Sequence, residues 1–246
     1  MKAMILAAGL GTRLRPLTNN RPKALVTVAG RTMLEITLAR LHDFGVNEVI
    51  VNTHHHAEMI RDYLAANHNF GMRVEISHED ELLDTGGGLK KAAWFFLEGD
   101  SPEPFLVHNV DVVSNIDLVR IAEFRAASGA LAALAVQERE TSRYLLFDEE
   151  GLLCGRRSGR DGETQLARPA QATQPLAFCG IHIVSPRIFA SLTETGAFSI
   201  IDAYLRLAAQ GEKITAFRAD GAYWRDLGKP ESVEQASREL ENKLPS

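Results

Sequence analysis

The sequence has little cysteine and no long apolar run. Only two of its 246 residues are cysteines, Cys154 and Cys179. That is too few for a disulfide framework, and no paired-cysteine metal spacing is present. No apolar stretch approaches the ~20 residues that a membrane span requires, and the opening MKAMILAAG is too short for a signal peptide. We therefore expect a cytoplasmic location, in a reducing compartment, and no membrane partner.

Excess basic charge and several common active-site signatures are also missing. The net charge is -5 with a pI near 5.9, which argues against a general nucleic-acid binder because such proteins usually carry a basic face. Neither a Walker pattern nor a G-x-S-x-G nucleophile motif occurs. The run His54-His55-His56 does not predict zinc, because three consecutive histidines cannot all point at one ion.

Apolar periodicity predicts alternating strands and helices in the first 140 residues. The expected strands are 2–7, 48–52, 73–78, 105–108 and 130–136, and the expected helices are 33–44, 57–66, 89–97 and 118–127. This alternation predicts an α/β fold, a Rossmann-like three-layer sandwich with a mostly parallel central sheet. Ligands bind such sheets at the carboxyl ends of the strands, so residues 9–15 and 109–111 are expected to converge.

The second half has a different pattern and embellishes the fold. We expect a hairpin around residues 150–151, then a polar loop or irregular hairpin rich in Gly and Pro. A strand at 177–184, a helix at 200–210, strands at 214–218 and 223–226, and a helix at 231–243 follow. Without a linker or an internal repeat, residues 1–246 are predicted to form one domain with an embellished second half.

The segment GLGTRLRP at residues 9–16 suits a polyphosphate. Its glycines let backbone N–H groups approach phosphate oxygens, and Arg13 and Arg15 would neutralise them. A dinucleotide fingerprint requires a third glycine, but Leu14 stands there and Pro16 interrupts the helix that should follow. The alternative is a tight turn with surface arginines.

Four further features are ambiguous one by one. Lys23 is either a phosphate contact or a solvated lysine. The run DTGGG at residues 84–88 leads either into a base- or phosphate-binding helix start or into a surface loop. A carboxylate just before it, from Glu79, Asp80 or Glu81, could accept a base N–H. Asp111 and Asp226 are either turn residues or ligands of Mg²⁺, which one or two carboxylates usually hold together with substrate phosphates.

Together these motifs resemble the signature of the sugar-1-phosphate nucleotidyltransferases. The resemblance covers nearly the whole chain and implies a nucleotide-binding half (1–140) and a sugar-binding half (141–246). It comprises LAAGLGTRLRPLT at 6–18, PKAL at 22–25, VAG at 28–30, TGGG at 85–88, Asp111, FCGI at 178–181 and WRDLGKP at 224–230.

The resemblance implies a reaction in which an NTP and a sugar 1-phosphate give an NDP-sugar and pyrophosphate. It implies catalytic roles for Arg13, Lys23 and Asp111. Nucleotide binding is implied for Leu6, Ala8, Gly9, Gly11, Thr12, Arg13, Glu81, Gly86 and Gly87. Sugar binding is implied for Asn109, Gly180 and Asp226, and Mg²⁺ binding for Asp111 and Asp226.

The chain departs from the family pattern in three places. Many relatives carry a mid-chain Glu-Lys-Pro whose lysine contacts the sugar phosphate, whereas Arg168-Pro169 is only a weak counterpart. Arg156, Arg157 and Arg160 are alternatives for that contact. The usual glycine before the metal aspartate is Val110, and Thr27 replaces the proline usual after Pro-Lys-x-Leu-x.

Several alternatives remain open on the sequence alone. The base is that of UTP or GTP, because both offer a ring N–H to a carboxylate. The sugar is N-acetylmuramate 1-phosphate or a mannose or heptose 1-phosphate, and the enzyme is a monomer or a homo-oligomer. A non-catalytic nucleotide- or sugar-binding regulator on the same fold is the main functional alternative. A nicotinamide-dependent oxidoreductase is disfavoured by the missing third glycine.

Overall fold

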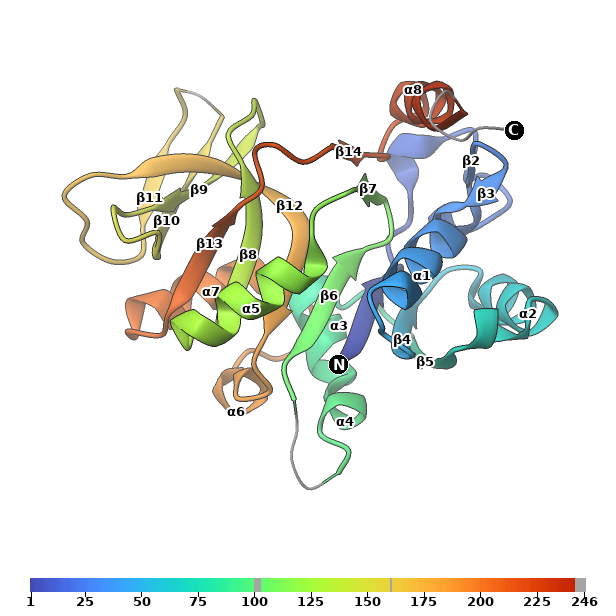
Figure 1. Ribbon diagram of the computed structural model, residues 1–246, viewed down its shortest axis with the longest axis horizontal. Helices are drawn as coiled ribbons and strands as arrows, with labels where there is room; N and C mark the ends of the chain where they lie inside the picture. The colour runs from blue at the N-terminus through green and yellow to red at the C-terminus, as the bar shows by residue number, and fades with distance from the viewer. Residues whose placement is uncertain (100–102, 160, 242–246) are drawn as a thin grey trace. The chain divides into compact units, whose positions relative to one another are not determined.

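The computed structural model describes residues 1–99, 103–159 and 161–241 (Figure 1). The chain divides into two compact units, each assembled from separate stretches of sequence. The first unit comprises Met1–Leu82, His108–Asn115 and the described part of Tyr223–Ser246. The second comprises the described parts of Leu83–Val107 and Ile116–Ala222. In the described ranges, no helix has both the length and the apolar character needed to cross a membrane.

Three parallel strands form the centre of the first unit. They are β1 (Lys2–Leu6), β4 (Glu48–Thr53) and β5 (Arg73–His78), with β4 between the other two. The apolar residues of β1 and β4 are consecutive, as expected of parallel strands that are covered on both faces. In β5, which ends the strand order, apolar and polar residues alternate. The last residues of β6 (Phe105–Asn109) lie beside β1, and the Val110 N–H donates to Leu6 O at 3.2 Å. The carboxyl ends of these strands therefore meet at one edge.

Helices connect the parallel strands of this unit as predicted. α1 (Met33–Asp43) joins β1 to β4 and α2 (Ala57–Ala66) joins β4 to β5. The Thr32 side chain caps α1 by accepting the Glu35 N–H at 3.0 Å, which satisfies a donor that the helix leaves unpaired. α8 (Pro230–Glu241) follows in the last segment of the unit. Residues 242 and 243 of the predicted helix lie outside the described residues.

Short elements complete the first unit, and most of them were not anticipated. They are η1 (Thr12–Leu14), η2 (Lys23–Leu25), β2 (Thr27–Val28), β3 (Arg31–Thr32), η3 (His68–Gly71), β7 (Val112–Ser114) and β14 (Trp224–Asp226). β7 and β14 pair antiparallel, with Asp226 opposite Val112. A three-residue strand has too little periodicity to be read from sequence, so β7 became visible only through its partner.

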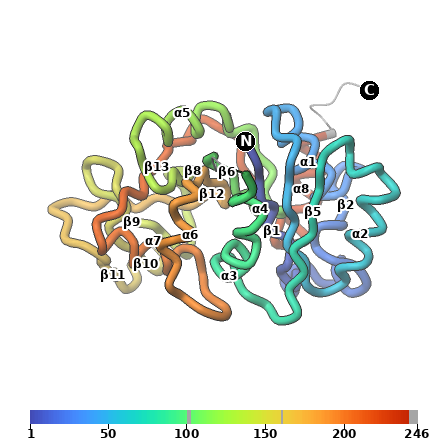
Figure 2. The backbone as a smooth tube through the Cα atoms, turned by 90° about the horizontal axis from the view of Figure 1, so that it is seen from below, coloured from blue at the N-terminus to red at the C-terminus, as the bar shows by residue number. Residues whose placement is uncertain are grey.

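The second unit is mainly antiparallel. Its strands are β8 (Ala132–Gln137), β9 (Arg143–Phe147), β10 (Leu153–Ser158), β11 (Thr164–Leu166), β12 (Gln174–Val184) and β13 (Ile214–Arg218). β11, β10, β9 and β12 are neighbours in that order, β8 pairs with β12, and β13 adds to β8 in parallel. α5 (Leu118–Ser128) and α7 (Ile200–Ala209) lie on opposite faces of these strands (Figure 2). The remaining helices are α3 (Asp84–Lys91), α4 (Ala93–Phe96) and α6 (Ile188–Ser191).

The α/β class with parallel strands at its centre is confirmed, but one helix prediction is wrong. A single helix was expected at 89–97, after the glycines. Instead α3 begins at Asp84 and contains Gly86, Gly87 and Gly88, and a separate turn forms α4. Glycine inside a helix costs about 0.5–1 kcal/mol relative to alanine, which is why the sequence pattern places the start later.

Close packing explains these helical glycines. The N–H groups of Gly86 and Gly87 donate to Phe198 O at 2.9 and 3.3 Å, so that carbonyl satisfies donors of the first helical turn. A Cβ on Gly86 would lie 2.3 Å from the Phe198 ring, and one on Gly87 would lie 2.6 Å from Gly196 O. Any side chain at either position would push α3 away from the segment before α7.

We therefore expect Gly86→Ala to destabilise the protein. The gain in helix propensity is small, whereas overpacking costs typically about 1–3 kcal/mol. At about 2–4 °C per kcal/mol for a chain of this size, the melting temperature should fall by several degrees. Gly221→Ala is the control, because no atom lies within 4 Å of its Cβ position. Equal melting temperatures for the two variants would contradict the packing argument.

Candidate functional site

The glycine loop after β1 folds back onto the segment that carries Lys23. Gly11 precedes η1 with φ of 62°, a left-handed conformation that glycine adopts without strain. A Cβ at Gly11 would lie 3.0 Å from Thr18 Cγ2 and 3.2 Å from Lys23 Cβ. Thr18 also donates its hydroxyl to Gly11 O at 2.8 Å. A larger residue at position 11 would therefore separate the loop from Lys23.

Lys23 and Asp111 form an ion pair at the end of β6. Lys23 Nζ donates to Asp111 Oδ2, and the two side chains are only 12% and 13% exposed. Charges shielded from water to this degree interact more strongly than pairs on an open surface. The backbone of Asp111 is fixed as well, because its carbonyl accepts the Leu227 N–H at 2.8 Å. Two of the three predicted catalytic residues are thus in direct contact.

The side chains of Asp226 and Arg13 both lie close to Gly228. Asp226 Oδ1 accepts the Gly228 N–H at 2.7 Å. A Cβ on Gly228 would lie 2.5 Å from that oxygen and 2.9 Å from Arg13 Nη2. Because Asp226 is paired with Val112 across β7 and β14, it lies at the same end of that ladder as Asp111. The first unit therefore brings together Arg13, Lys23, Asp111 and Asp226.

The sequence analysis missed two ionisable side chains whose pKa values are shifted by burial, Arg40 beside β7 and His108 in β6. Arg40 of α1 donates through Nη1 to both the carbonyl and the hydroxyl of Ser114, and burial lowers the Arg40 pKa to about 10. Burial, aided by the Arg40 charge, lowers the pKa of His108 to about 3. His108 is therefore neutral near neutral pH. In the sequence, the one indication of the buried His108 is that a polar residue stands within an apolar strand.

The predicted base contact at Glu81 is an exposed side chain. Glu79, two residues earlier, is 1% exposed and accepts from Asn52 Nδ2 at 2.7 Å. Asn52 was not singled out from sequence, although it is a buried amide at the end of an apolar strand. Among the nucleotide residues implied by resemblance, Leu6 ends β1 and Ala8 lies next to it, 8% exposed.

Two other predicted groups have structural partners of their own. The N–H groups of Gly86 and Gly87 donate to Phe198 O, as described above. Gly180 lies in β12 with φ of +71°, where the pairing with β8 shifts register between Phe178 and His182. Asn109 ends β6, and its carbonyl lies 2.8 Å from His108 Nδ1. Their roles in nucleotide and sugar binding stay predictions.

The arginines considered for the sugar phosphate differ in their partners. Arg156 pairs with Asp202 of α7 through Nη1, and Arg168 pairs with Asp148. Arg157, by contrast, lies over the Tyr144 ring at 5.3 Å. Its Nε is buried with no hydrogen-bond partner in the described part of the chain. Arg160 lies outside the described residues.

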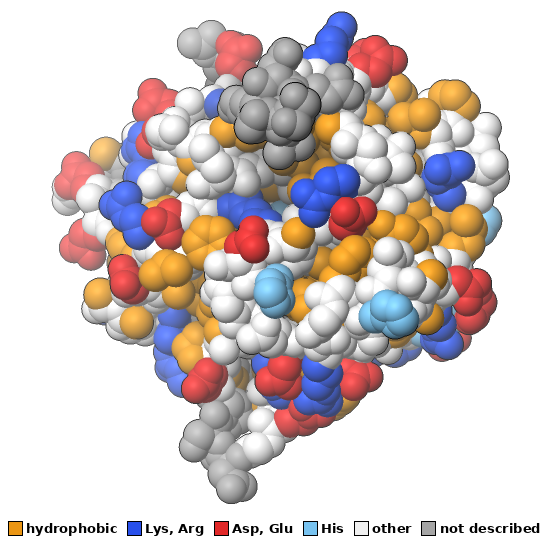
Figure 3. Space-filling view, turned by 45° about the vertical axis from the view of Figure 1, so that its right-hand side comes forward, with side chains coloured by type: hydrophobic (Ala, Val, Ile, Leu, Met, Phe, Trp, Pro, Cys, Tyr) orange, Lys and Arg blue, Asp and Glu red, His pale blue; other side chains and the backbone are white. Residues whose placement is uncertain are grey.

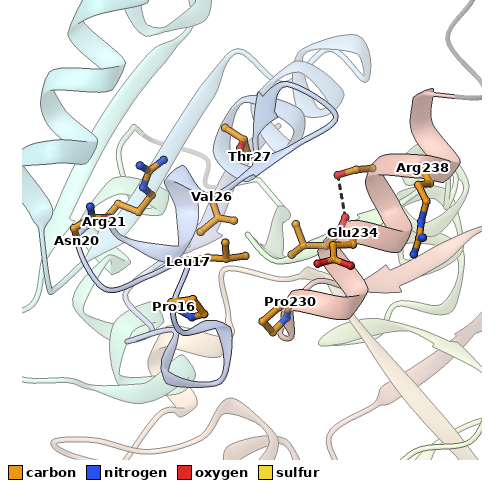
Figure 4. A pocket seen from close by; sticks show the side chains of 11 residues that line it. Pro16, Leu17, Asn20, Arg21, Val26, Thr27, Pro230, Glu234 and Arg238 are labelled. Atoms are coloured by element: carbon orange, nitrogen blue, oxygen red, sulfur yellow. Dashed lines mark hydrogen bonds between the residues drawn. The ribbon is translucent and has the colours of Figure 1, made fainter.

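A pocket of about 810 Å³ also opens in the first unit, between residues 16–27 and α8 (Figure 4). Leu17 and Val26 face α8 across it. Ser237 of α8 is tied back to its own helix, because its hydroxyl donates to Val233 O at 3.0 Å. Arg13, Lys23, Asp111 and Asp226 are not among its lining residues.

Comparison with known proteins links this chain to one family. A family model described as "Nucleotidyl transferase" matches residues 2–243. N-acetylmuramate alpha-1-phosphate uridylyltransferase of Caulobacter vibrioides is 36% identical, over 97% of this chain and 96% of its own length. Mannose-1-phosphate guanylyltransferase catalytic subunit beta of Drosophila pseudoobscura pseudoobscura is 30% identical over 93% of this chain. The alignment spans 59% of that longer relative.

Solved structures share the architecture. HddC from Yersinia pseudotuberculosis, complexed with GMP-PN, has a TM-score of 0.76 and 25% identity, with 97% of this chain and 99% of that chain covered. A UDP-glucose pyrophosphorylase complexed with UDP-glucose has a TM-score of 0.77 at 20% identity, over 99% of both chains. This second likeness is one of fold alone.

The buried His108 predicts a specific acid sensitivity. Below the ordinary histidine pKa of about 6.5 the unfolded chain takes up a proton that folded His108 refuses until about pH 3. Folding stability should therefore decline as the pH falls through this window, by up to about 1.4 kcal/mol per unit from this group. His108→Gln should flatten the pH dependence of unfolding free energy between pH 6.5 and 4.5, as measured by urea titration. His42→Gln, at an exposed position of α1, is the control. Identical slopes for the two variants would contradict the assignment.

Proposed function

The chain belongs to the nucleotidyltransferase family, and we propose on that premise that it transfers the uridylyl group of UTP to N-acetylmuramate 1-phosphate. The reaction class is the transfer of a nucleotidyl group from an NTP to a sugar 1-phosphate, which gives an NDP-sugar and pyrophosphate. The Lys23–Asp111 pair beside Asp226 and Arg13 carries the catalytic assignment. The Caulobacter relative, aligned over nearly the full length of both chains, supports these substrates.

The chemistry requires charge neutralisation rather than a protein nucleophile. An oxygen of the sugar phosphate attacks the α-phosphorus of the NTP in line. One O–P bond forms, the bond to the β-phosphate oxygen breaks, and pyrophosphate leaves with that electron pair. Because both reactants are anions, the protein must hold them together and spread the developing charge. A phosphate oxygen is already ionised near neutral pH, so no general base is needed.

Local cations supply this neutralisation. Arg13 and the backbone N–H groups of Gly9, Gly11 and Thr12 hold the triphosphate, and Lys23 stabilises the charge that moves toward pyrophosphate. Basic and acidic side chains are interspersed on the face seen in Figure 3. The chain carries a net charge of -5, so the attraction of anionic substrates depends on a few placed cations rather than on a basic surface.

Asp111 and Asp226 are proposed to bind Mg²⁺. In the described ranges no group of three or more His, Cys, Asp or Glu forms a metal cage. Mg²⁺ usually takes one or two carboxylates and completes its shell with water and substrate phosphates, so an oxygen donor set of two aspartates fits. The bound ion would neutralise phosphate charge. Lys23 already contacts one oxygen of Asp111, which orients the carboxylate.

Binding of the base, ribose and sugar follows the family resemblance. Leu6, Ala8, Glu81, Gly86 and Gly87 are proposed for the base and ribose, and Asn109, Gly180 and Asp226 for the sugar. For the sugar phosphate we favour Arg157. Arg156 and Arg168 are each paired with an aspartate, whereas the Arg157 guanidinium lies over the Tyr144 ring at 5.3 Å, and its Nε has no hydrogen-bond partner in the described ranges. A guanidinium held in this way is preorganised for a phosphate.

A second substrate pair is kept because particular relatives favour it. The guanylyltransferase relative points to GTP with mannose 1-phosphate, and HddC, which was solved with GMP-PN, points to a guanine nucleotide. Heptose 1-phosphate is kept as an alternative sugar on the sequence resemblance. A non-catalytic regulator is disfavoured, because Arg13, Lys23, Asp111 and Asp226 are all present and converge. The enzyme is proposed to act in the cytoplasm as a monomer or a homo-oligomer.

A substrate matrix tests the proposal. UTP, GTP and the other NTPs are each combined with N-acetylmuramate, mannose and heptose 1-phosphates, and pyrophosphate release is measured with Mg²⁺ present. We expect the highest kcat/KM for UTP with N-acetylmuramate 1-phosphate. Asp111→Asn should lower kcat by at least about 100-fold in a variant that still folds, whereas Asp62→Asn on the exposed side of α2 should not. Absence of pyrophosphate release from every pair would refute the proposed function, and full activity of Asp111→Asn would refute its role.

The Arg157 contact predicts a selective kinetic effect. A hydrogen bond between charged groups contributes about 1.5–3 kcal/mol, so Arg157→Ala should raise the KM for sugar 1-phosphate by about 10- to 100-fold. The KM for the NTP should stay the same. Arg156→Ala removes the neighbouring arginine of the same strand and should leave both KM values near wild type. If Arg156→Ala, and not Arg157→Ala, raises the KM for sugar 1-phosphate, the assignment is wrong.

A further inference from the structure

One buried amide joins three strand ends of the first unit. Asn52 Oδ1 accepts the N–H groups of Ala7 and Ala8 at 2.6 and 3.3 Å. Its Nδ2 donates to Glu79 Oε1 at 2.7 Å. Ala7 and Ala8 follow β1, Asn52 is the last but one residue of β4, and Glu79 directly follows β5. A single side chain therefore connects the exits of all three parallel strands.

The orientation of this amide is fixed by its partners. Rotating it by 180° would place its NH₂ group against two backbone N–H donors and its carbonyl oxygen against a carboxylate. Asn52 is 3% exposed and Glu79 is 1% exposed, so water offers little compensation for such a mismatch. Glu79 is held through its backbone too. Its N–H donates to Thr53 O at 2.7 Å, and its carbonyl lies 2.8 Å from His54 Nδ1.

These bonds lie where the β-ladder stops. The last register pair between β1 and β4 is Leu6 with Asn52, so the amides of Ala7 and Ala8 have no ladder partner on β4. Both residues are buried, and a buried N–H without an acceptor costs about 1–3 kcal/mol. The Asn52 side-chain oxygen supplies the acceptor that the β-ladder does not provide for these two N–H groups. The backbone that enters the loop at Gly9 is therefore positioned by a side chain rather than by the sheet.

We infer that Asn52, oriented by Glu79, is a positioning residue for the triphosphate loop. It contacts no substrate in this role. It fixes the backbone of Ala7 and Ala8, and so the direction in which Gly9, Gly11 and Thr12 present their N–H groups. This inference rests on the proposed function, because that function makes the loop a triphosphate site.

Exchanging the two side chains provides the test. In Asn52→Asp a carboxylate faces the Glu79 carboxylate, the pair repels, and the loop shifts. In the double variant Asn52→Asp/Glu79→Gln the acceptor for Ala7 and Ala8 remains, and the donor moves to position 79. The hydrogen bonds and the net charge of the pair are both restored. If Glu79 acted only by touching the base itself, this exchange would not recover nucleotide binding.

UTP binding is measured by calorimetry with Mg²⁺ and without sugar 1-phosphate, so that no turnover occurs. We expect Asn52→Asp to weaken UTP binding by about 10- to 100-fold, as loss of an orienting partner does at other sites, and the double variant to regain most of it. The KM for sugar 1-phosphate should not change. Thr53→Val is the matched control. The hydroxyl of Thr53, the residue after Asn52, is buried and makes no hydrogen bond in the described ranges. Its removal should therefore leave UTP binding intact.

Two results would overturn the inference. One is wild-type UTP affinity in Asn52→Asp, and the other is a double variant that melts like wild type yet binds UTP as weakly as the single variant. If Asn52→Asp does not fold, Asn52→Ser removes the same bonds without adding charge and must weaken UTP binding. A wild-type protein that binds UTP but forms no NDP-sugar would refute the proposed function while leaving the role of Asn52 intact.

Discussion

The first unit depends on how the backbone is satisfied where its parallel strands end. A ladder of β1, β4 and β5 pairs its own N–H and C=O groups, but the residues that leave the sheet lose these partners while still buried. Three contacts replace the ladder. Asn52 Oδ1 accepts the N–H groups of Ala7 and Ala8, Thr53 O accepts the Glu79 N–H, and Leu6 O accepts the Val110 N–H. Each contact also fixes the first residue of a loop. The edge that needs extra hydrogen bonds is therefore the edge where loops are held firmly enough to orient substrates.

Electrostatics adds a second layer to this edge. Lys23 and Asp111 neutralise each other when no substrate is bound. Neither charge is therefore left uncompensated at a site shielded from water. Beneath it, Arg40 is bound to Ser114 of β7, and its charge together with burial keeps His108 neutral.

Glycine has two distinct uses in this chain, and only one of them was recognised from the sequence. Gly11 permits a left-handed turn and close approach to Lys23, as its place in a GLG loop indicates. Gly86 and Gly87 lie inside a helix, where they admit Phe198 and Gly196. In the sequence alone, glycines that precede an apolar run predict a loop. Only the partner segment, more than 100 residues later, shows that the run of three glycines is a packing surface.

The sequence by itself determined the α/β class, the bounds of α2 and β5, the glycine loop and the identity of the residues that converge on it. Those features depend on local periodicity or on contiguous motifs, which a linear reading contains. The tertiary structure alone decided that Asn52 accepts the N–H groups of Ala7 and Ala8, and that Glu79 rather than Glu81 is buried. It also decided that Arg156 and Arg168 form ion pairs with Asp202 and Asp148. The physical reason is the same in each case. Whether a polar side chain is available depends on which distant group reaches it in the fold, and the sequence does not record that distance.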